Sequence, residues 1–252
     1  MKERKKIACV IPARLHSLRF PKKVLAGLRG KPLLRWSFEA ALNCGCFDKV
    51  VIAVDAEETF AAASSFTKEV YYTSSKCQSG TERLVEIQQK NIIDADIWVN
   101  WQADEPFLSK TMIKDLLQDL QHPSAEVWTL KTKITRERDR LDPNVVKVVS
   151  DFHGKALYFS RHSIPFQKTE GCFPLYKHIG IYAYSNEGLK KISRLPPAEL
   201  ELCENLEQLR FLYHGLHILV HETKEESFGI DTKDDLADAE MYLSQKFGKY
   251  LS

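Results

Sequence analysis

A cluster of cations follows the first apolar segment of the sequence. The run IACVI ends at Pro12, and the next residues include Arg14, Arg19, Lys22 and Lys23. Arginine offers a planar fork to phosphate oxygens and lysine a compact charge, so this loop suits a polyphosphate whose negative charge must be held and increased during a reaction. A solvated basic turn is the alternative, because the loop matches neither a Walker A nor a G-x-G-x-x-G pattern.

Two acidic segments could hold a metal ion. Asp104 lies in QADEP, directly after the apolar run IWVNW, and Asp231 lies in FGIDTKDDL. A carboxylate at a strand end, beside a polyphosphate, is where Mg²⁺ needs a ligand, and a second acid from another loop could complete the site. Simpler interpretations stay open, because an Asp-Glu-Pro turn often only terminates a strand, and Asp231 or Thr232 could cap a final helix.

Other polar residues lie in less specific settings. The segment SGTER opens a helix candidate at Ser79, where free backbone N–H groups and small hydroxyls could hold a base edge or a phosphate. Arg161 and His178 lie on or beside strands predicted in the second half, and Glu207 and Gln208 lie on the polar side of a predicted helix. A single histidine of this kind is usually structural, and such a glutamate is usually solvated.

Strands and helices must position these residues, and they alternate in the first half of the chain. Four apolar runs read as strands, and each is followed by a helix candidate; the runs cover residues 7–11, 49–54, 70–72 and 96–101. In the first helix candidate, apolar residues from Leu34 to Leu42 recur on one face. The alternation predicts a parallel sheet with right-handed crossovers. Ligands of such sheets lie beyond the carboxyl ends of the strands, so the loops after Ile11, Val54 and Trp101 should converge.

The second half of the chain is richer in strands. Strand-like runs cover residues 126–134, 145–150, 156–160, 176–184 and 217–221, and DFHGK reads as a hairpin turn between the second and third of them. A helix is predicted over 203–213, with Leu202, Leu206, Leu209 and Tyr213 on one face, and another from about 234 to 247. These patterns predict an α/β fold: a Rossmann-like, mostly parallel sheet with an additional β-rich lobe, all in one domain covering 1–252.

Composition limits the classes of function. The 252 residues are 44% hydrophobic, which is enough for a sizeable core, and the net charge of +2 gives no reason to expect binding to nucleic acid or to an anionic membrane. The first apolar run is too short for a secretory signal or a membrane span, so a cytoplasmic protein is expected. Among six cysteines only Cys44 and Cys46 form a close pair, so reduced thiols are expected rather than a zinc site.

Eight segments, in order and spacing, resemble the 3-deoxy-manno-octulosonate cytidylyltransferase (CMP-Kdo synthetase) family of Gram-negative bacteria. IPARLHSLRFPKK resembles the family pattern P-A-R-x-x-S-x-R-x-P-x-K, and QADEP resembles Q-G-D-E-P. The other six segments are SGTERL, DPNVVKVV, ALYFSRHSIP, HIGIYAY, NLEQLRFL and GIDTKDDL. The resemblance covers nearly the whole chain.

This resemblance implies that the anomeric hydroxyl of 3-deoxy-D-manno-octulosonate (Kdo) attacks the α-phosphorus of CTP, giving CMP-Kdo for lipopolysaccharide and pyrophosphate. It implies a requirement for Mg²⁺, held by Asp104 and Asp231, with Lys23 completing the catalytic residues. The nucleotide would be bound by Ala13, Arg14, Lys23, Ser79 and Arg83. The sugar acid would be bound by Gln102, Arg161, His178, Tyr182, Glu207 and Gln208. The resemblance also implies a homodimer, with residues 1–125 as the nucleotide-binding part, 126–225 as the sugar-binding and dimerisation lobe, and 226–252 as the metal-ligand loop and final helix.

The sequence departs from the family pattern at several positions. Ala103 and Lys22 replace usual glycines, Val24 replaces a usual proline, and Cys77 and Leu202 stand where many members carry histidine. If position 103 needs a positive φ, the methyl group of Ala103 would strain the turn.

Two other functions remain open on the sequence alone. The same transfer could serve another 2-keto sugar acid, such as 8-amino-Kdo or a sialic acid. The chain could also be a nucleotide-sugar binding protein without turnover, for which Ala103 is the motivating feature.

Overall fold

The computed structural model describes residues 4–17, 20–122, 124–169, 171 and 173–247. These residues pack as two units. The first comprises the described parts of Met1–Asp94, Asn100–Lys110 and Ser227–Ser252, and the second comprises those of Ala95–Val99 and Thr111–Glu226. The first unit is therefore built from three separate stretches of chain.

Parallel strands form the centre of the first unit. β1 (Ile7–Ala13) pairs with β4 (Lys49–Val54), and β4 pairs with β5 (Val70–Tyr72). From Ala8 to Ala13 every residue of β1 is buried, as expected for parallel strands that are covered on both faces. The prediction of parallel strands in this half of the chain is confirmed.

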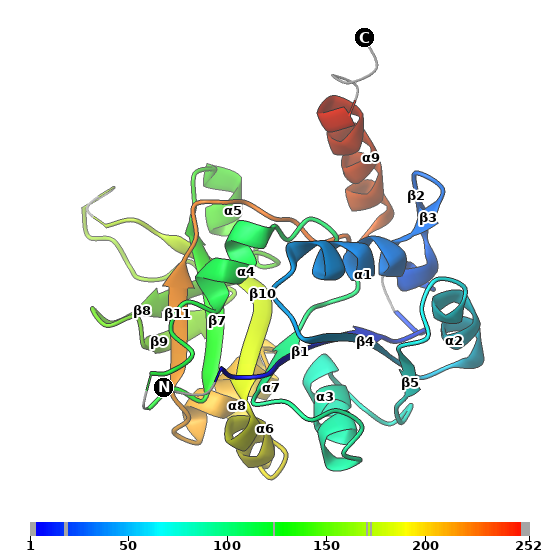
Figure 1. Cartoon of the computed structure of the whole chain (residues 1–252). Coiled ribbons are helices and arrows are strands. Elements are labelled where there is room, and N and C mark those ends of the chain that lie inside the picture. The colour runs from blue at the N-terminus through cyan, green and yellow to red at the C-terminus, as the bar shows by residue number, and fades with distance from the viewer. Residues whose placement is uncertain (1–3, 18–19, 123, 170, 172, 248–252) are drawn as a thin grey trace. The chain divides into compact units, whose positions relative to one another are not determined.

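Helices cover these strands on both faces. α1 (Leu33–Cys44) lies on one face of β1 and β4, α3 (Gly80–Gln89) lies on the other, and α2 (Glu57–Ser64) packs beside β5 (Figure 1). Helix α1 ends at Gly45, whose φ of 64° is the left-handed conformation that glycine adopts without steric cost. Most of the predicted apolar face of α1 is buried, but Leu42 is 51% exposed.

A small apolar cluster joins the start of the chain to its last helix within the first unit. The basic loop leads into the 3₁₀ turn η1 (Lys23–Leu25) and then into the ribbon β2 (Gly27–Leu28) and β3 (Lys31–Pro32). Helix α9 (Lys233–Phe247) packs against this ribbon. The cluster consists of Leu28, Leu33, Ile230, Ala239 and Leu243. It holds the backbone beside Lys23 and the backbone beside Asp231 in one packed group.

The second unit contains the β-rich lobe. Its strands are β6 (Ile97–Asn100), β7 (Val127–Lys133), β8 (Lys147–Ser150), β9 (Ala156–Ser160), β10 (Tyr176–Ser185) and β11 (Ile218–Glu222). They lie in the order β11-β7-β10-β6, with β8 beside β10 and β9 beside β8. β11 is parallel to β7, whereas β10 is antiparallel to β7 and β8, and β8 is antiparallel to β9. The predicted mixed character of this half is confirmed.

The predicted hairpin between β8 and β9 is also present. Asp151 Oδ1 accepts hydrogen bonds from the backbone N–H groups of His153 and Lys155, both at 2.9 Å. Gly154 adopts a φ of 84°, which its lack of a side chain permits. The DFHGK segment therefore forms the predicted turn, through the side chain of Asp151 and the backbone conformation of Gly154.

A bulge in β10 brings two aromatic rings together. The register of β10 against β7 shifts between Ile179 and Tyr182, and Thr129 Oγ1 lies within hydrogen-bonding distance of the carbonyl oxygens of Ile179 and Ile181. Residues four apart in a regular strand are separated by about 13 Å. The ring centroids of His178 and Tyr182 nevertheless lie 5.3 Å apart.

Short helices complete the second unit. They are α4 (Lys110–Leu116), α5 (Glu137–Leu141), α6 (Asn186–Ile192), α7 (Glu199–Glu204) and α8 (Gln208–Tyr213). None of the helices in the described part of the chain combines the length and apolar composition that a membrane crossing requires.

The predicted single helix over 203–213 is wrong. Asn205 adopts the left-handed conformation, with φ 52°, and separates α7 from α8. Asparagine tolerates this conformation better than most residues and often ends a helix. Leu206 and Leu209 are buried as predicted, whereas Leu202 is 72% exposed and Tyr213 56% exposed, because the break removes them from a common face.

Candidate active site

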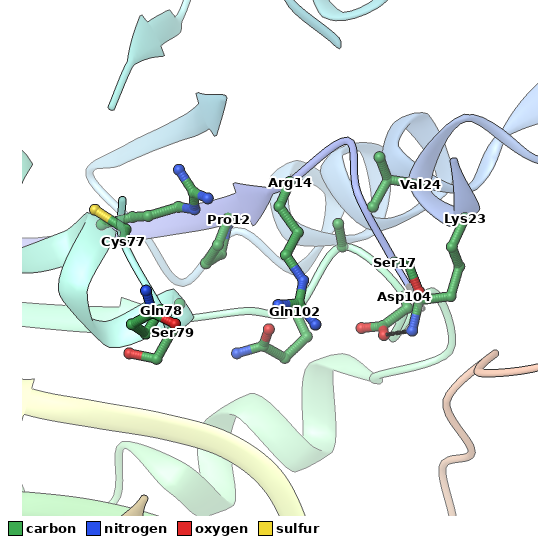
Figure 2. Close-up of a pocket in the computed structure, with 13 residues that line it drawn as sticks. Pro12, Arg14, Ser17, Lys23, Val24, Cys77, Gln78, Ser79, Gln102 and Asp104 are labelled. Carbon is green, nitrogen blue, oxygen red and sulfur yellow. Dashed lines mark hydrogen bonds and ion pairs between the residues drawn. The ribbon is translucent and has the colours of Figure 1, made fainter. Parts of the chain in front are cut away.

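A pocket of about 160 Å³ lies at the carboxyl end of the parallel strands of the first unit (Figure 2). Several predicted residues line it, namely Arg14, Lys23, Ser79, Arg83, Gln102 and Asp104. Its walls come from the loop after β1, the start of α3 and the QADEP segment. The Trp101 N–H donates to the carbonyl oxygen of Val10 at 3.1 Å. The QADEP segment therefore begins near the carboxyl end of β1, at the edge where ligands of parallel sheets bind.

Lys23 joins the two predicted metal ligands. Its Nζ donates to Asp104 Oδ2, and to Asp231 Oδ1 at 2.6 Å; Figure 2 shows Lys23 reaching toward Asp104. Burial disfavours the charged form of Lys23, but the two carboxylates outweigh burial and raise its pKa above the ordinary value. The ammonium group is therefore retained at neutral pH, and two acids distant in the sequence lie around one cation.

Backbone contacts place Asp231. The Ile230 N–H donates to the carbonyl oxygen of Asp104 at 2.9 Å, which ties the two acidic segments together. Thr232 Oγ1 accepts from the Asp235 N–H at 3.1 Å and caps α9. Of the two predicted capping residues, Thr232 has this role, while the carboxylate of Asp231 contacts Lys23.

The neighbouring acid, Glu105, has a different environment. Its carboxyl group accepts from Ser227 Oγ at 3.1 Å, and a side chain at Gly229 would place a Cβ 3.0 Å from Glu105 Oε1. Burial, with the charge of Asp104, raises the pKa of Glu105 to about 8. Glu105 is therefore largely protonated at neutral pH in this structure, whereas Asp104 contacts the ammonium group of Lys23.

The two substitutions for glycine have different outcomes. Positive φ among the described non-glycine residues occurs at Lys22, Arg29, Asn91 and Asn205, and not at Ala103. The strain considered for Ala103 therefore does not arise; this residue is buried, and its carbonyl oxygen accepts from Ser37 Oγ at 2.8 Å. Lys22 instead takes the left-handed conformation, with φ 55° and ψ 31°.

The remaining nucleotide-side residues divide into exposed and buried groups. Arg14 is exposed at the mouth of the pocket, and Ala13 before it is buried at the end of β1. Ser79 accepts from the Glu82 N–H at 3.2 Å and caps α3. Arg83 is only 2% exposed and forms an ion pair with Asp55 at 2.9 Å. Arg19 of the basic loop lies outside the described residues.

Asp55 is not among the predicted site residues, although it lies in the loop after Val54 that was expected to converge on the site. The available signal was an acid directly following a buried parallel strand, and the structure shows this acid bonded to Arg83 and to the backbone of Leu15.

Cys77 also lines the pocket. Burial, together with a hydrogen bond to Glu86, raises the pKa of its thiol to about 11, so Cys77 is protonated at neutral pH. The described cysteines 9, 44, 46, 77 and 203 are free thiols, as predicted; Cys172 lies outside the described residues.

The predicted sugar-binding residues fall in both units. Gln102 lines the pocket of the first unit, and its Nε2 donates to Asn100 Oδ1 at 2.9 Å. The others lie in the second unit. Arg161 donates to three backbone carbonyl oxygens: those of Glu204 at 2.7 Å, Pro143 at 2.9 Å and Asn205 at 3.2 Å. These contacts fix the guanidinium group through neutral oxygens.

The last four predicted sugar-binding residues form two pairs in the second unit. His178 and Tyr182 lie on β10, and Glu207 and Gln208 lie at the start of α8. The ring of His178 contacts Tyr182, and its Nε2 lies 2.9 Å from Thr129 Oγ1. Burial lowers the pKa of His178 to about 3, and burial with nearby Tyr184 and Glu207 raises the pKa of Tyr182. Both side chains are therefore neutral at physiological pH. Gln208 is buried, and Glu207 forms an ion pair with Arg210 at 3.0 Å.

Two of the predicted residues are candidates for holding a metal ion. In the described ranges, no group of three His, Cys, Asp or Glu side chains is placed to hold a metal ion. The pair Asp104 and Asp231 nevertheless fits Mg²⁺, which is commonly bound by one or two carboxylates together with substrate phosphates and water. Both carboxylates already contact a single positive group.

Comparison with known proteins agrees with this geometry. A family model described as cytidylyltransferase matches residues 8–223. The chain belongs to the cytidylyltransferase family. Among the cytidylyltransferases that it resembles, 3-deoxy-manno-octulosonate cytidylyltransferase of Acidobacterium capsulatum is 42% identical over 238 residues, which cover 94% of this chain and 96% of the relative. The enzyme of the same name from Thermodesulfovibrio yellowstonii is 42% identical over 249 residues, covering 94% and 97%.

Solved structures share this fold. A CMP:2-keto-3-deoxy-manno-octonic acid synthetase, solved in complex with CTP, superposes with a TM-score of 0.90 at 36% identity, covering 96% of this chain and 99% of the other. The 4-diphosphocytidyl-2C-methyl-D-erythritol synthase of Anaerococcus prevotii superposes with a TM-score of 0.64 at 14% identity, covering 95% and 96%. The second likeness shows the fold alone. The predicted α/β fold class and the family resemblance are confirmed.

Proposed function

We propose that this chain transfers the cytidylyl group of CTP to Kdo, forming CMP-Kdo for lipopolysaccharide and releasing pyrophosphate. The family, the names of relatives at about 40% identity and the CTP complex of a solved relative support this function. The observation that carries it is the contact of Lys23 with both Asp104 and Asp231, since Lys23 and Asp104 line one pocket with Arg14.

Arg14 and Lys23 would bind the triphosphate. Arg14 is exposed at the pocket and offers a bidentate fork to phosphate oxygens. Lys23 would bring its ammonium group beside the triphosphate when the α-phosphorus is attacked. A fixed ammonium group beside the phosphates stabilises the negative charge that increases in the transition state and on the leaving pyrophosphate.

Asp104 and Asp231 would hold Mg²⁺. When bound, the ion would supply charge neutralisation and orientation of the phosphate oxygens. Because Lys23 contacts both carboxylates in this structure, it would have to give up part of these contacts for the carboxylates to ligate a cation. Lys23 would then be available to the phosphates.

The predicted sugar-acid residues have side chains suited to the groups of such a ligand. Arg161 makes its three hydrogen bonds to backbone carbonyl oxygens, so the positive charge of its guanidinium group is available to a ligand carboxylate. His178 and Tyr182, both neutral, suit hydroxyl groups because each can donate and accept. Glu207 and Gln208 would contribute further polar contacts to the hydroxyls.

A substrate panel tests this function. Pyrophosphate release would be measured with CTP, UTP, GTP or ATP, each combined with Kdo, 8-amino-Kdo or a sialic acid, with Mg²⁺ and with EDTA. We expect release with CTP, Kdo and Mg²⁺ alone. Binding of CTP without pyrophosphate would show a binding protein, release with another sugar acid would change the substrate, and undiminished release in EDTA would refute the metal requirement.

We also propose a cytoplasmic homodimer. Nucleoside triphosphates are cytoplasmic, and a transferase that consumes CTP must meet them there. The second unit exposes apolar side chains on three elements that pack together, β9, α7 and α8: Leu157, Leu200, Leu202 and Tyr213. An exposed apolar patch of this kind is typical of an interface between subunits.

A further inference from the structure

We propose that Asp55 is a positioning residue for nucleotide binding, fixing both the phosphate-binding loop and Arg83 through one carboxylate. This inference rests on the proposed use of CTP. Asp55 directly follows β4, at the carboxyl edge where the pocket lies, but does not itself line the pocket. Its Oδ1 accepts from the Leu15 N–H at 2.9 Å, and its Oδ2 accepts from Arg83 Nη2 at 2.9 Å.

Each of the two donors is adjacent to the pocket. Leu15 follows Arg14, so its hydrogen bond fixes the backbone from which the Arg14 side chain extends. Arg83 is in the pocket wall, where its Nη1 also donates to Thr73 Oγ1 at 2.7 Å and to the Ser74 carbonyl oxygen at 3.1 Å. Asp55 thereby connects the loops after β1, β4 and β5 to helix α3.

Burial makes this connection sensitive to charge. The side chains of Arg83 and Asp55 are only 2% and 9% exposed. Removing one partner of a buried ion pair leaves the other charge without compensation, which is costly. In Asp55→Asn the amide has a single acceptor oxygen for two donors, so either the Leu15 N–H or Arg83 loses its partner. The donor that loses its partner lies beside groups that line or carry the pocket, so we expect these groups to shift.

The other end of β4 provides a matched control. Asp48 precedes β4, its Oδ2 accepts from the Ile7 N–H at 2.9 Å, and its Oδ1 accepts from Arg4 Nη2 at 2.7 Å. Asp48 thus makes a comparable pair of contacts, to the N–H of a β1 residue and to an arginine, at the amino end of the strands, although the side chains of Asp48 and Arg4 are 38% and 79% exposed. Asp48→Asn changes the same chemistry away from the pocket.

The experiment compares Asp55→Asn with Asp48→Asn in the full chain. CTP affinity would be measured by calorimetry with Mg²⁺, and kcat and the two KM values by pyrophosphate release. We expect Asp55→Asn to weaken CTP binding and raise KM for CTP by about tenfold, which corresponds to about 1.4 kcal/mol of binding free energy. In Asp55→Asn, KM for Kdo should stay within about twofold of the wild-type value. In Asp48→Asn, CTP affinity should stay within about twofold of the wild-type value, because Asp48 makes none of the contacts of Asp55.

Amide hydrogen exchange without ligand gives a second readout. Asp55→Asn should speed exchange across residues 13–17 and leave residues 8–11 of β1 unchanged, whereas Asp48→Asn should not affect 13–17. This measurement tests positioning even if the wild-type protein proves not to use CTP, so failure of the proposed function and failure of this inference can be told apart.

Three results would overturn the inference: wild-type CTP affinity in Asp55→Asn, equal loss of affinity in both variants, or unchanged exchange at 13–17. If Asp55→Asn does not fold, Asp55→Glu replaces it, because the longer side chain keeps the charge but displaces the carboxylate from the Leu15 N–H and Arg83. A folded Asp55→Glu protein with unaltered CTP affinity would then refute the positioning role.

Discussion

At the scale of single residues, the site depends on a cation that two carboxylates share. Lys23 contacts Asp104 and Asp231, whose positions differ by 127 residues (231 minus 104). The sequence suggested that both acids could serve one site, but their meeting could not be derived from local patterns. It results from the packing of α9 on the β2–β3 ribbon, a tertiary contact that periodicity does not encode.

We expect Asp104→Asn to lower kcat by about a hundredfold or more while the protein stays folded, because an amide keeps the shape but loses the negative charge that a divalent ion requires. Pyrophosphate release and circular dichroism would be measured on the same samples. Asp94→Asn is the control, since Asp94 is an exposed acid paired with Lys6. Near-normal turnover in Asp104→Asn would show that the metal is held elsewhere.

His178 should make stability depend on pH. Its pKa is lowered to about 3 by burial, from an ordinary value near 6.5, so between these values the unfolded chain binds a proton that the folded chain does not. Stability is therefore fully retained above about pH 6.5 and falls as pH decreases toward 3, by at most about 1.4 kcal/mol per pH unit from this group. Urea unfolding between pH 7 and 4 should show a shallower loss in His178→Gln than in the wild type. Parallel curves would contradict the assignment.

At the scale of elements, the sequence patterns predicted those strands and turns whose ends are determined by the side chains of nearby residues. β4, β5 and β9 begin and end at the predicted residues, and the β8–β9 turn follows from Asp151 and Gly154. The helix break at Asn205 was missed because asparagine is compatible with both a helix interior and a left-handed cap, and the flanking leucines kept the helical spacing. The β10 bulge was missed for a similar reason, since the alternation of HIGIYAY continues through it.

The turn before η1 allows a test of backbone strain. Lys22 has φ 55°, a conformation that disfavours side chains with a Cβ. Lys22→Gly should be more stable than Lys22→Ala by about 0.5–1 kcal/mol, the reverse of the order in a helix or strand. Both variants lose the ion pair with Glu58, so the difference isolates the backbone. Denaturant unfolding measures it; equal or greater stability of Lys22→Ala would show that position 22 is not left-handed in solution.

At the scale of the whole molecule, the sequence established the fold class and the family, whereas the division into units was beyond its reach. The first unit includes Ser227–Ser252, which the sequence places after the whole β-rich lobe. Neither Pro-Pro at 196–197 nor the loop near Gly171 marks a boundary between the two units. The chain passes from one unit to the other near residues 95–110 and 226. The composition of these segments is that of ordinary strand ends and does not mark a boundary between units.

The proposed dimer makes a prediction about the assembly. Leu202 on α7 is 72% exposed, and a charge in the apolar core of a subunit interface is unfavourable. Leu202→Glu should therefore elute as a monomer in size-exclusion chromatography with light scattering at a concentration where the wild type elutes as a dimer. Leu141→Glu, at a leucine of α5 that is 67% exposed, should remain a dimer. A dimeric Leu202→Glu protein would place the interface elsewhere.

The bond between Lys23 and Asp231 spans 208 positions of the chain. During synthesis the ribosome releases the basic loop early and the second acid only after the strands of both units have been made. A nascent chain that has folded β1, β4 and β5 and has passed QADEP presents Lys23 with Asp104 alone. Translation that stops before residue 231 would consequently yield a protein with most of the fold and an incomplete site for the nucleotide.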